Sequence, residues 1–303
     1  MKNYFNIQYP IFHRVGIVLL FSLAFSVTNL MAQDETGTTE VVKVKPVKNT
    51  FGSTLVMNNQ TVMVPIKGTL QFDIQHCFGT VNNGSKDLFG LFAPSNIRLG
   101  LGYTLINNLT LGLGITKERM QMDLNAKYAL LRQTDGKMPV SLTYYGNIVI
   151  DTRAASNFRY DAHRLSYFNQ LLIARKITSK FSAQVAPSFS WFNNIDGYVD
   201  SKGDIQKKMN NGHFAVSVLG RYKISENSAI IAGYDQPLTS HPTNNPHPNI
   251  CFGIETTTSA HAFQVFVGNY YGIVPQSNNM FNRNDYTAGN FLIGFNITRL
   301  WNY

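Results

Sequence analysis

The sequence predicts an all-β protein, a transmembrane antiparallel up-and-down β-barrel of about 12 strands. First, charged residues make up only 14% of the 303 residues, whereas about a quarter is usual in soluble proteins. Second, 21 Phe, 15 Tyr and 23 Gly favour many short strands and turns over helices. Third, beyond the N-terminus no apolar run approaches the ~20 residues that a membrane-spanning helix needs. A chain this apolar is also not expected to be disordered.

Strict alternation of apolar and polar residues is the main evidence for the barrel. In residues 121–128, one face would carry Met122, Leu124, Ala126 and Tyr128, and the other Gln121, Asp123, Asn125 and Lys127. Successive side chains of a strand point to opposite faces, so one face would contact lipid and the other water. Twelve segments show this pattern, and we place them at 68–78, 96–105, 109–116, 120–132, 139–151, 163–177, 181–192, 212–224, 228–235, 249–256, 261–269 and 290–303.

The links between these segments alternate in length. Those after the second, fourth, sixth, eighth and tenth segments are short, and those after the first, fifth, seventh, ninth and eleventh are long: 79–95, 152–162, 193–211, 236–248 and 270–289. Short turns at one end and long loops at the other are typical of bacterial outer-membrane barrels. Only the tight link Lys117–Arg119 departs from this rule.

The last segment supports the same class of protein. Phe291, Phe295 and their neighbours share one face of an amphipathic strand, and the chain ends at Tyr303. Such a strand resembles the C-terminal strand recognised by the barrel assembly machinery of the outer membrane, which we therefore expect as a partner. In a soluble β-sandwich this edge would be left exposed and prone to aggregate, whereas a closed barrel has no edges.

The N-terminal part is expected to direct export. Residues 1–32 combine Lys2 and Arg14 with the apolar run Val15–Phe25 and small residues before Gln33, the pattern of a signal peptide cleaved near Ala32. Residues 33–67 form either a periplasmic leader or a plug that enters the barrel, and the barrel itself would span 68–303. The predicted location is the Gram-negative outer membrane, with its lipid as a partner.

Net charge and cysteines add two further expectations. After removal of Lys2 and Arg14, 24 cations and 17 acidic residues remain. The cations are scattered rather than clustered, so we expect no nucleic-acid partner. Cys77 and Cys251 lie on strands three apart around the barrel, beyond the reach of a disulfide unless the wall is pinched.

Several segments resemble a family of Bacteroidetes β-barrels of unknown function, domain of unknown function 5777. They are Asn96–Tyr103, Lys127–Gln133, Ser141–Thr143 and His261–Asn269. The resemblance covers roughly 51–300 and implies a barrel in a Gram-negative outer membrane. It implies no activity and no catalytic residues.

No motif for catalysis or for a cofactor is present. The sequence has no phosphate-binding loop, no H-E-x-x-H motif and no G-x-S-x-G elbow, so we expect no catalytic residues and no cofactor, and we predict that the protein is not an enzyme. Five histidines, His76, His163, His213, His241 and His247, fall at the long-loop end. His241 and His247 are weak metal-ligand candidates, and turn-capping His-Pro pairs are the better interpretation.

Charged residues on the polar faces of the strands are the best candidates for the lumen lining. They are Asp73, Arg98, Asp123, Lys127, Arg221 and Glu255. In a narrow barrel they would pair and fill the lumen, and in a wide one they would line water. A barrel of twelve strands has a width between these two cases, so a filled lumen and a water-lined lumen both stay open.

Three functions are compatible with this lining. The first is a narrow channel or binding barrel for a small solute, in which Arg98, Lys127 and Arg221 attract anions and the loops 193–211 and 270–289 gate the mouth. The second is a structural or adhesive barrel whose loops bind a partner. The third is a lipid hydrolase, which would need a Ser-His pair that the sequence does not single out.

Overall fold

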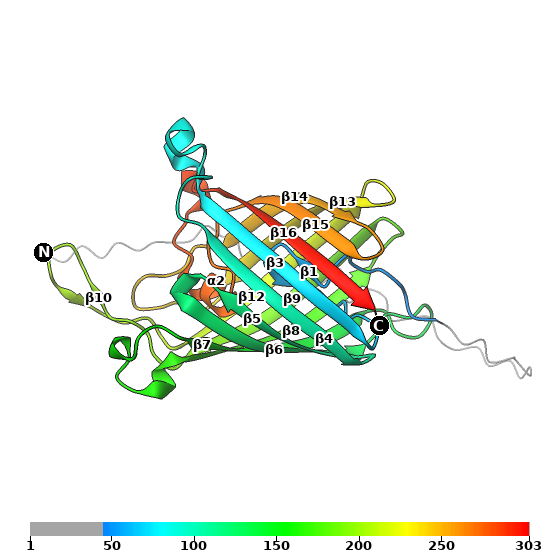
Figure 1. Cartoon of the computed structure of the whole chain (residues 1–303), viewed down its shortest axis with the longest axis horizontal. Helices are drawn as coiled ribbons and strands as arrows, with labels where there is room; N and C mark the ends of the chain where they lie inside the picture. The colour runs from blue at the N-terminus through cyan, green and yellow to red at the C-terminus, as the bar shows by residue number, and fades with distance from the viewer. Residues whose placement is uncertain (1–44, 303) are drawn as a thin grey trace, which may run out of the picture. The chain divides into compact units, whose positions relative to one another are not determined.

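The computed structural model describes residues 45–302, and a closed antiparallel barrel of twelve strands forms most of that range (Figure 1). The strands of the wall are β3 (Thr69–Thr80), β4 (Asn96–Ile106), β5 (Leu109–Thr116), β6 (Gln121–Leu131), β7 (Ser141–Asp151), β8 (Leu165–Lys176), β9 (Phe181–Phe192), β12 (Gly212–Lys223), β13 (Ser228–Pro237), β14 (Asn249–Thr257), β15 (His261–Gly268) and β16 (Leu292–Asn302). Each predicted strand is confirmed, with ends within two residues of those expected. The predicted signal peptide, 1–32, and the first residues of 33–67 lie outside the described residues.

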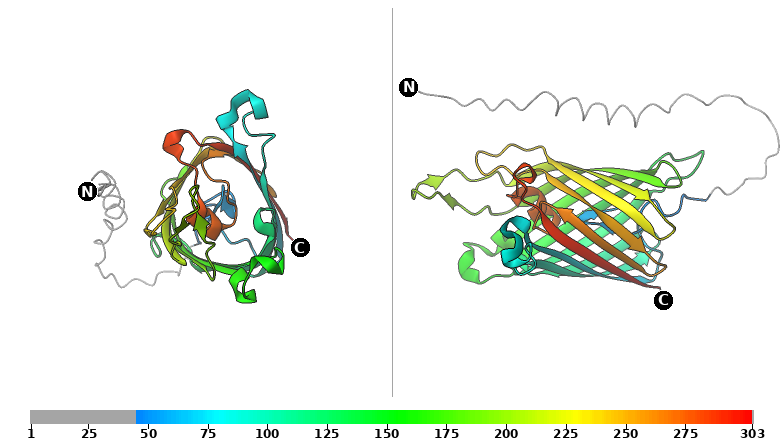
Figure 2. Two further views of the ribbon diagram at one scale, coloured as in Figure 1. Left: turned by 90° about the vertical axis from the view of Figure 1, so that its left-hand side faces the viewer. Right: turned by 90° about the horizontal axis from the view of Figure 1, so that it is seen from above.

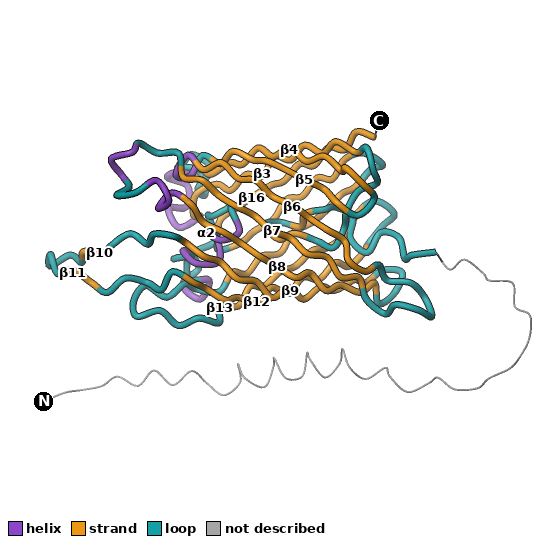
Figure 3. Tube along the Cα trace, turned by 90° about the horizontal axis from the view of Figure 1, so that it is seen from below, coloured by secondary structure: helices purple, strands orange, loops and turns teal. Residues whose placement is uncertain are grey.

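Every strand of the wall pairs with its neighbours in sequence, and the last closes on the first. β16 pairs antiparallel with β3 from Leu292↔Thr80 to Asn302↔Thr69, and the two lie side by side in Figure 1. The short links gather at one end of the barrel, here called the turn end, and the long ones at the other, the loop end (Figure 3). At the loop end only the link between β5 and β6 is tight, a single 3-10 turn at Glu118–Met120.

The outward face of the wall is apolar. Large side chains in the middle of strands are solvent-exposed there, among them Leu113 at 49%, Leu124 at 60% and Val265 at 61%. Near the turn end, exposed aromatic side chains are distributed around the barrel: Tyr103, Tyr128, Tyr144, Phe181, Tyr222 and Phe263. An apolar band edged by aromatic residues is the surface by which a membrane barrel contacts lipid. Among residues 45–302, no helix is long and apolar enough to cross a membrane.

The remaining elements lie in the links and inside the barrel. A two-stranded hairpin, β1 (Leu55–Val56) and β2 (Asn59–Gln60), precedes the wall. The link 193–211 carries a second hairpin, β10 (Tyr198–Val199) and β11 (Ile205–Gln206), and the link 269–291 carries helix α2 (Pro275–Phe281). Short 3-10 turns occur at Val81–Asp87, Ala155–Asn157, Asp161–Arg164 and Tyr286–Ala288. Viewed along the barrel axis, the N-terminal hairpin and α2 both lie inside the ring of strands (Figure 2).

Candidate functional site in the barrel lumen

The inward face of the wall is mostly polar. Amide and hydroxyl side chains alternate with the outward apolar ones and are buried: Gln71, Gln75, Gln121, Thr143, Asn147, Gln170, Gln184, Ser188, Ser217, Asn249, Gln264 and Asn296. In a solvent-filled channel these groups would bind water. Here they are buried because other parts of the chain occupy the lumen, and the occupants are held largely through them.

The first occupant is the segment 51–64, which enters from the turn end. The backbone of Met57, at the hairpin turn, donates to Gln264 Oε1 (2.8 Å) and accepts from Asn296 Nδ2 (2.7 Å). On the opposite side of the lumen, Gln184 accepts from the Val62 amide (3.0 Å) and donates to the Gln60 carbonyl (2.7 Å). Side chains of the wall thus satisfy the free backbone groups of a hairpin too short to satisfy its own.

A small apolar cluster anchors this hairpin at its centre. Phe51, Val56 and Met57 are fully buried. They pack with apolar side chains that the wall turns inward, among them Tyr145, Phe168, Leu172, Ala186, Leu219, Ile231 and Phe266. Burying one such side chain contributes about 1.5–3 kcal/mol, so the cluster gives the hairpin a fixed position that hydrogen bonds alone would not.

The second occupant is α2, which folds inward from the loop end. Its polar side chains reach the wall, with Gln276 Nε2 donating to Asn147 Oδ1 (3.2 Å) and Asn279 Nδ2 to Ser188 Oγ (3.3 Å). Met280 packs with Phe192, Ile195 and Met209 at the base of the loop 193–211. The loop 270–289 therefore fills the mouth, whereas the tip of 193–211 is exposed, with Ile205 86% exposed.

Four of the six predicted lumen charges form two buried ion pairs. The guanidinium of Arg98 contacts both carboxylate oxygens of Asp123, with Nε and one terminal nitrogen each at 2.8 Å. Arg221 Nε lies 2.6 Å from Glu255 Oε1, and Gln264 donates to the other oxygen of Glu255 at 3.0 Å. Within each pair the two strands are separated by one intervening strand.

The other two predicted charges make hydrogen bonds instead. Asp73 accepts from Gln71 (2.6 Å) and from Thr298 (2.7 Å). Lys127 donates to the backbone oxygen of Thr54 in the inserted segment (2.8 Å). All six residues thus project inward, and in this state they form a bonded network around an occupied lumen.

The two weak metal-ligand candidates have different partners. His241 Nε2 lies 2.9 Å from His213 Nδ1, with the rings stacked, and its Nδ1 accepts from the Asn210 amide (3.1 Å). His247 lies 3.9 Å from Asp285. Among residues 45–302, no group of three His, Cys, Asp or Glu side chains is arranged to hold a metal ion.

Cys77 and Cys251 are both free and buried. Both belong to the cluster that surrounds Tyr270, directly after β15. Burial raises the pKa of the Tyr270 phenol well above its ordinary value. Both thiols belong to the wall and pack in one cluster with Tyr270 of the loop 270–289. The sequence did not indicate this contact.

Little free space remains between the hairpin and the wall of β3 to β6. A cavity of about 40 Å³ lies between it and the wall of β3 to β6, lined by Gln71, Asp73, Arg98, Asn125 and Lys127 among others. A volume of this size accommodates little more than water. On this side of the hairpin the lumen is therefore filled.

Comparison with known protein families gives one match. The model of a family described as a membrane bound beta barrel domain, DUF5777, matches residues 51–301.

The chain belongs to this family.

The predicted family is thus confirmed, and the protein is a membrane-bound β-barrel. The match begins at the inserted segment, so the DUF5777 domain includes the occupant of the lumen as well as the wall. Restriction to Bacteroidetes stays a prediction.

Three solved structures of similar architecture are described as outer-membrane porins or channels. The NanC porin is 9% identical, with 77% of this chain and 99% of that chain covered and a TM-score of 0.47. The COG4313 outer membrane channel from Pseudomonas putida F1 is 14% identical, with 79% and 97% covered and a TM-score of 0.48. The KdgM porin is 10% identical, with 78% and 99% covered and a TM-score of 0.42. At these values the likeness carries no argument about what this DUF5777 barrel binds. No curated protein shows significant similarity to the chain.

Proposed function

We propose that this DUF5777 protein is an outer-membrane barrel, closed at rest, that passes or binds a small hydrophilic solute when its lumen occupants move. The observation that carries the proposal is the lumen itself. Its wall is lined with amide, hydroxyl and charged groups, and it is filled by two separate inserts, 51–64 and α2, rather than by the wall's own side chains. A purely structural barrel could be filled more stably with apolar side chains.

The contacts of α2 support a displaceable insert. Its five buried residues are Gln276, Ser277, Asn278, Asn279 and Met280. Two of their buried oxygens, Gln276 Oε1 and Asn278 Oδ1, have no hydrogen-bond partner among the described residues. A buried polar group without a partner lowers stability by about 1–3 kcal/mol, so water or a solute that reaches these atoms would favour movement of the helix.

The lumen charges would act when the inserts leave. Withdrawal of 51–64 removes the backbone acceptor of Lys127 and uncovers the Arg221–Glu255 pair, against which Gly52 lies. Of the six lumen charges, Lys127 and Asp73 would then be the two outside an ion pair, and Lys127 would contact an anionic group of the solute. The proposed role is non-enzymatic and involves no cofactor. Nucleic acid is not among the proposed partners.

Location and assembly belong to the same proposal. Residues 1–32 would direct export and be removed, and the final amphipathic strand would be recognised by the barrel assembly machinery. The turn end would then face the periplasm and the loop end the exterior.

Conductance across planar lipid bilayers tests the proposal. The wild-type protein is expected to show little current, because both inserts are in place, and deletion of 51–64 together with replacement of 273–282 by a short Gly-Ser linker is expected to open a steady conductance. A matched control deletes 199–205 from the exposed hairpin tip and should behave as wild type.

A second variant covers a failure of the deletion to fold. Changing Val56 and Met57 to Ser removes most of the apolar anchoring while keeping the hairpin backbone, and it should raise the frequency of opening. If the folded deletion and the folded Ser variant both carry no current at any voltage, the passage proposal is wrong.

A further inference from the structure

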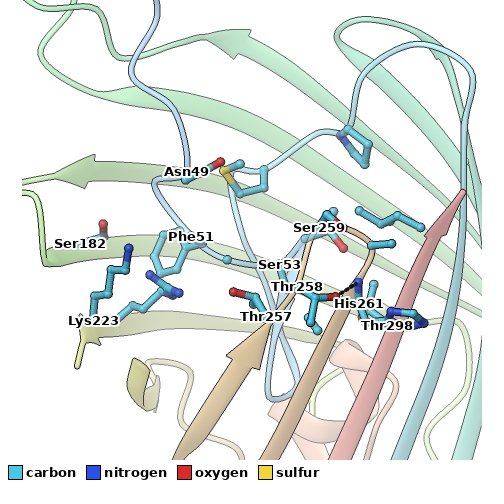
Figure 4. Close-up of a pocket in the computed structure, with 18 of the residues that line it drawn as sticks. Asn49, Phe51, Ser53, Ser182, Lys223, Thr257, Thr258, Ser259, His261 and Thr298 are labelled. Atoms are coloured by element: carbon cyan, nitrogen blue, oxygen red, sulfur yellow. Dashed lines mark hydrogen bonds between the residues drawn. The ribbon is translucent and has the colours of Figure 1, made fainter. Parts of the chain in front are cut away.

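A second, larger cavity lies at the turn end of the barrel. It has a volume of about 380 Å³ and lies between the segment 49–65 and the wall formed by the turn-end parts of β8, β9, β12 and β14 to β16 (Figure 4). The segment 51–64 forms its inner limit, so the cavity is separate from the narrow space beside the hairpin. Its volume is within the range of about 300–1,000 Å³ that small-molecule sites occupy.

Lysine side chains line one side of this cavity. Lys176, Lys180 and Lys223 belong to its lining, together with Arg221. The strand register places them in one patch, because Lys176 is opposite Ser182, and Ser182 is opposite Arg221. The amide of Lys223 donates to the carbonyl of Lys180 at 2.8 Å, which brings the fourth cation to the same patch.

The positive charge of this patch is largely uncompensated within the protein. Arg221 is paired with Glu255, but no carboxylate among residues 45–302 lies within 4.0 Å of the ammonium groups of the three lysines. Of the residues that line the cavity, only Glu226 is acidic. Like charges gathered around a cavity lower the stability of the protein, and an anion bound among them would reverse that effect.

Hydroxyl groups line the opposite side. They belong to Ser53, Thr257, Thr258, Ser259 and Thr298, and Ser182 lies next to Lys223 (Figure 4). Hydroxyl side chains both donate and accept hydrogen bonds, so this side matches a ligand that carries hydroxyl groups of its own. His261 also lines the cavity.

We propose that this turn-end cavity is a binding site for a small hydroxylated anion, a molecule of sugar size with a phosphate or carboxylate group held by Lys176, Lys180 and Lys223. The inference rests on the proposed function in one respect, because it takes this anion to be the solute that the barrel passes or binds. Binding itself requires no passage and is measured separately.

Isothermal titration calorimetry on the full chain in a non-ionic detergent tests the site. The probes are glucose 6-phosphate and glucuronate, with glucose as their uncharged counterpart. Both anions are expected to bind at least about ten-fold more tightly than glucose, because charge-assisted hydrogen bonds are roughly twice as strong as neutral ones. Raising the ionic strength should weaken the binding of the anions.

The double variant Lys180→Ala/Lys223→Ala should weaken binding of glucose 6-phosphate at least about ten-fold, and Lys223→Arg with Lys180 intact should retain most of it. Neither lysine side chain makes a hydrogen bond that the fold needs, since only their backbone groups are bonded. The matched control is Lys137→Ala, an exposed lysine in the turn after β6 that does not line the cavity. A circular dichroism spectrum checks that each variant folds.

Three outcomes would overturn the inference: no heat from either anion at millimolar concentration, equal binding of glucose and glucose 6-phosphate, or equal binding by the double variant and the control. A polyglutamate peptide that binds where glucose 6-phosphate does not would also overturn it and would assign the patch to an acidic polypeptide. If the full chain binds glucose 6-phosphate but the barrel without its inserts carries no current, the binding site is supported and only the passage proposal is rejected.

Discussion

Each ion pair of the lumen joins two strands that are separated by one intervening strand. The intervening strand carries a small residue where the two charged side chains meet. Asp123 is opposite Gly114 of β5, and Glu255 is opposite Ala229 of β13. A larger side chain there would stand between the charged groups. Burying a charge without a close partner is costly, so the small residues are a requirement of the pairs on either side of them.

Gly114→Ala is therefore expected to destabilise the barrel. An added Cβ would overlap the guanidinium of Arg98 and the carboxylate of Asp123, and overpacking of this kind costs about 1–3 kcal/mol. Urea unfolding in detergent, followed by tryptophan fluorescence, measures the change. Gly220→Ala is the matched control, because its Cβ would meet only a ring carbon of Phe181 at 3.9 Å. Equal stabilities of the two variants would contradict the explanation.

The sequence predicted to which side of the wall each charged residue points, but not which residue it pairs with. Period-two alternation places Arg98, Asp123, Arg221 and Glu255 on the inward face, and the structure agrees. It contains no information on which inward groups meet two strands away, because that depends on register and on small residues such as Gly114. The lysine patch of the turn-end cavity was missed for the same reason.

Among the elements, the inserted ones depend most on their surroundings. β1 and β2 have two residues each and α2 has seven, lengths at which neither hairpin nor helix is stable alone in water. No periodicity in 51–64 or 270–289 indicates them, since their hydrogen bonds and apolar contacts come from the wall. This is why the alternation predicted twelve strands but left open whether 33–67 is a leader or a plug.

The loop after β13 shows how such an element responds to pH. His241 lies in this loop, and burial, together with the charge of Arg283, lowers the pKa of its imidazole below the ordinary 6.5. A lowered histidine pKa means that the folded state resists protonation. The neutral His241 imidazole therefore contributes fully to stability above pH 6.5, and this contribution is lost as the pH falls from 6.5 through the folded-state pKa. Protonation of Nδ1 would also break the hydrogen bond from the Asn210 amide.

Acidification from pH 7.5 to 5 is thus expected to loosen the contact between this loop and the link 193–211. Amide hydrogen exchange at Asn210, corrected for the intrinsic effect of pH, should be faster at pH 5. In His241→Gln the difference between the two pH values should disappear, while His163→Gln, in the loop after β7, should leave it unchanged. Equal protection of Asn210 at both pH values in the wild type would count against this role.

At the scale of the whole molecule, the outward apolar band determines where the barrel is stable. Leu113 lies in the middle of β5 with half of its surface exposed, and in a membrane that surface faces hydrocarbon. The opposite, polar face is covered by the inserts. The wall is therefore apolar outside and mostly polar inside, the reverse of the wall of a soluble barrel.

Leu113→Lys is expected to lower the free energy of unfolding in phosphatidylcholine vesicles by about 2–4 kcal/mol, the cost of a lysine near the bilayer midplane. Ile205→Lys makes the same change at the exposed tip of the β10–β11 hairpin and should have almost no effect. A similar loss in both variants would mean that β5 does not cross the bilayer at this depth.

The seam between β16 and β3, where the barrel closes, is also where the inserted segment is bonded. This seam joins residues from opposite ends of the chain, such as Thr69 and Asn302, and contacts so distant in sequence form late and slowly. The hairpin bonds to both edges of the seam, to Gln71 of β3 through Thr54 and to Asn296 of β16 through Met57. It precedes the first strand in the chain and contacts both strands of the seam, so the segment that occupies the lumen also links the two strands at which the barrel closes.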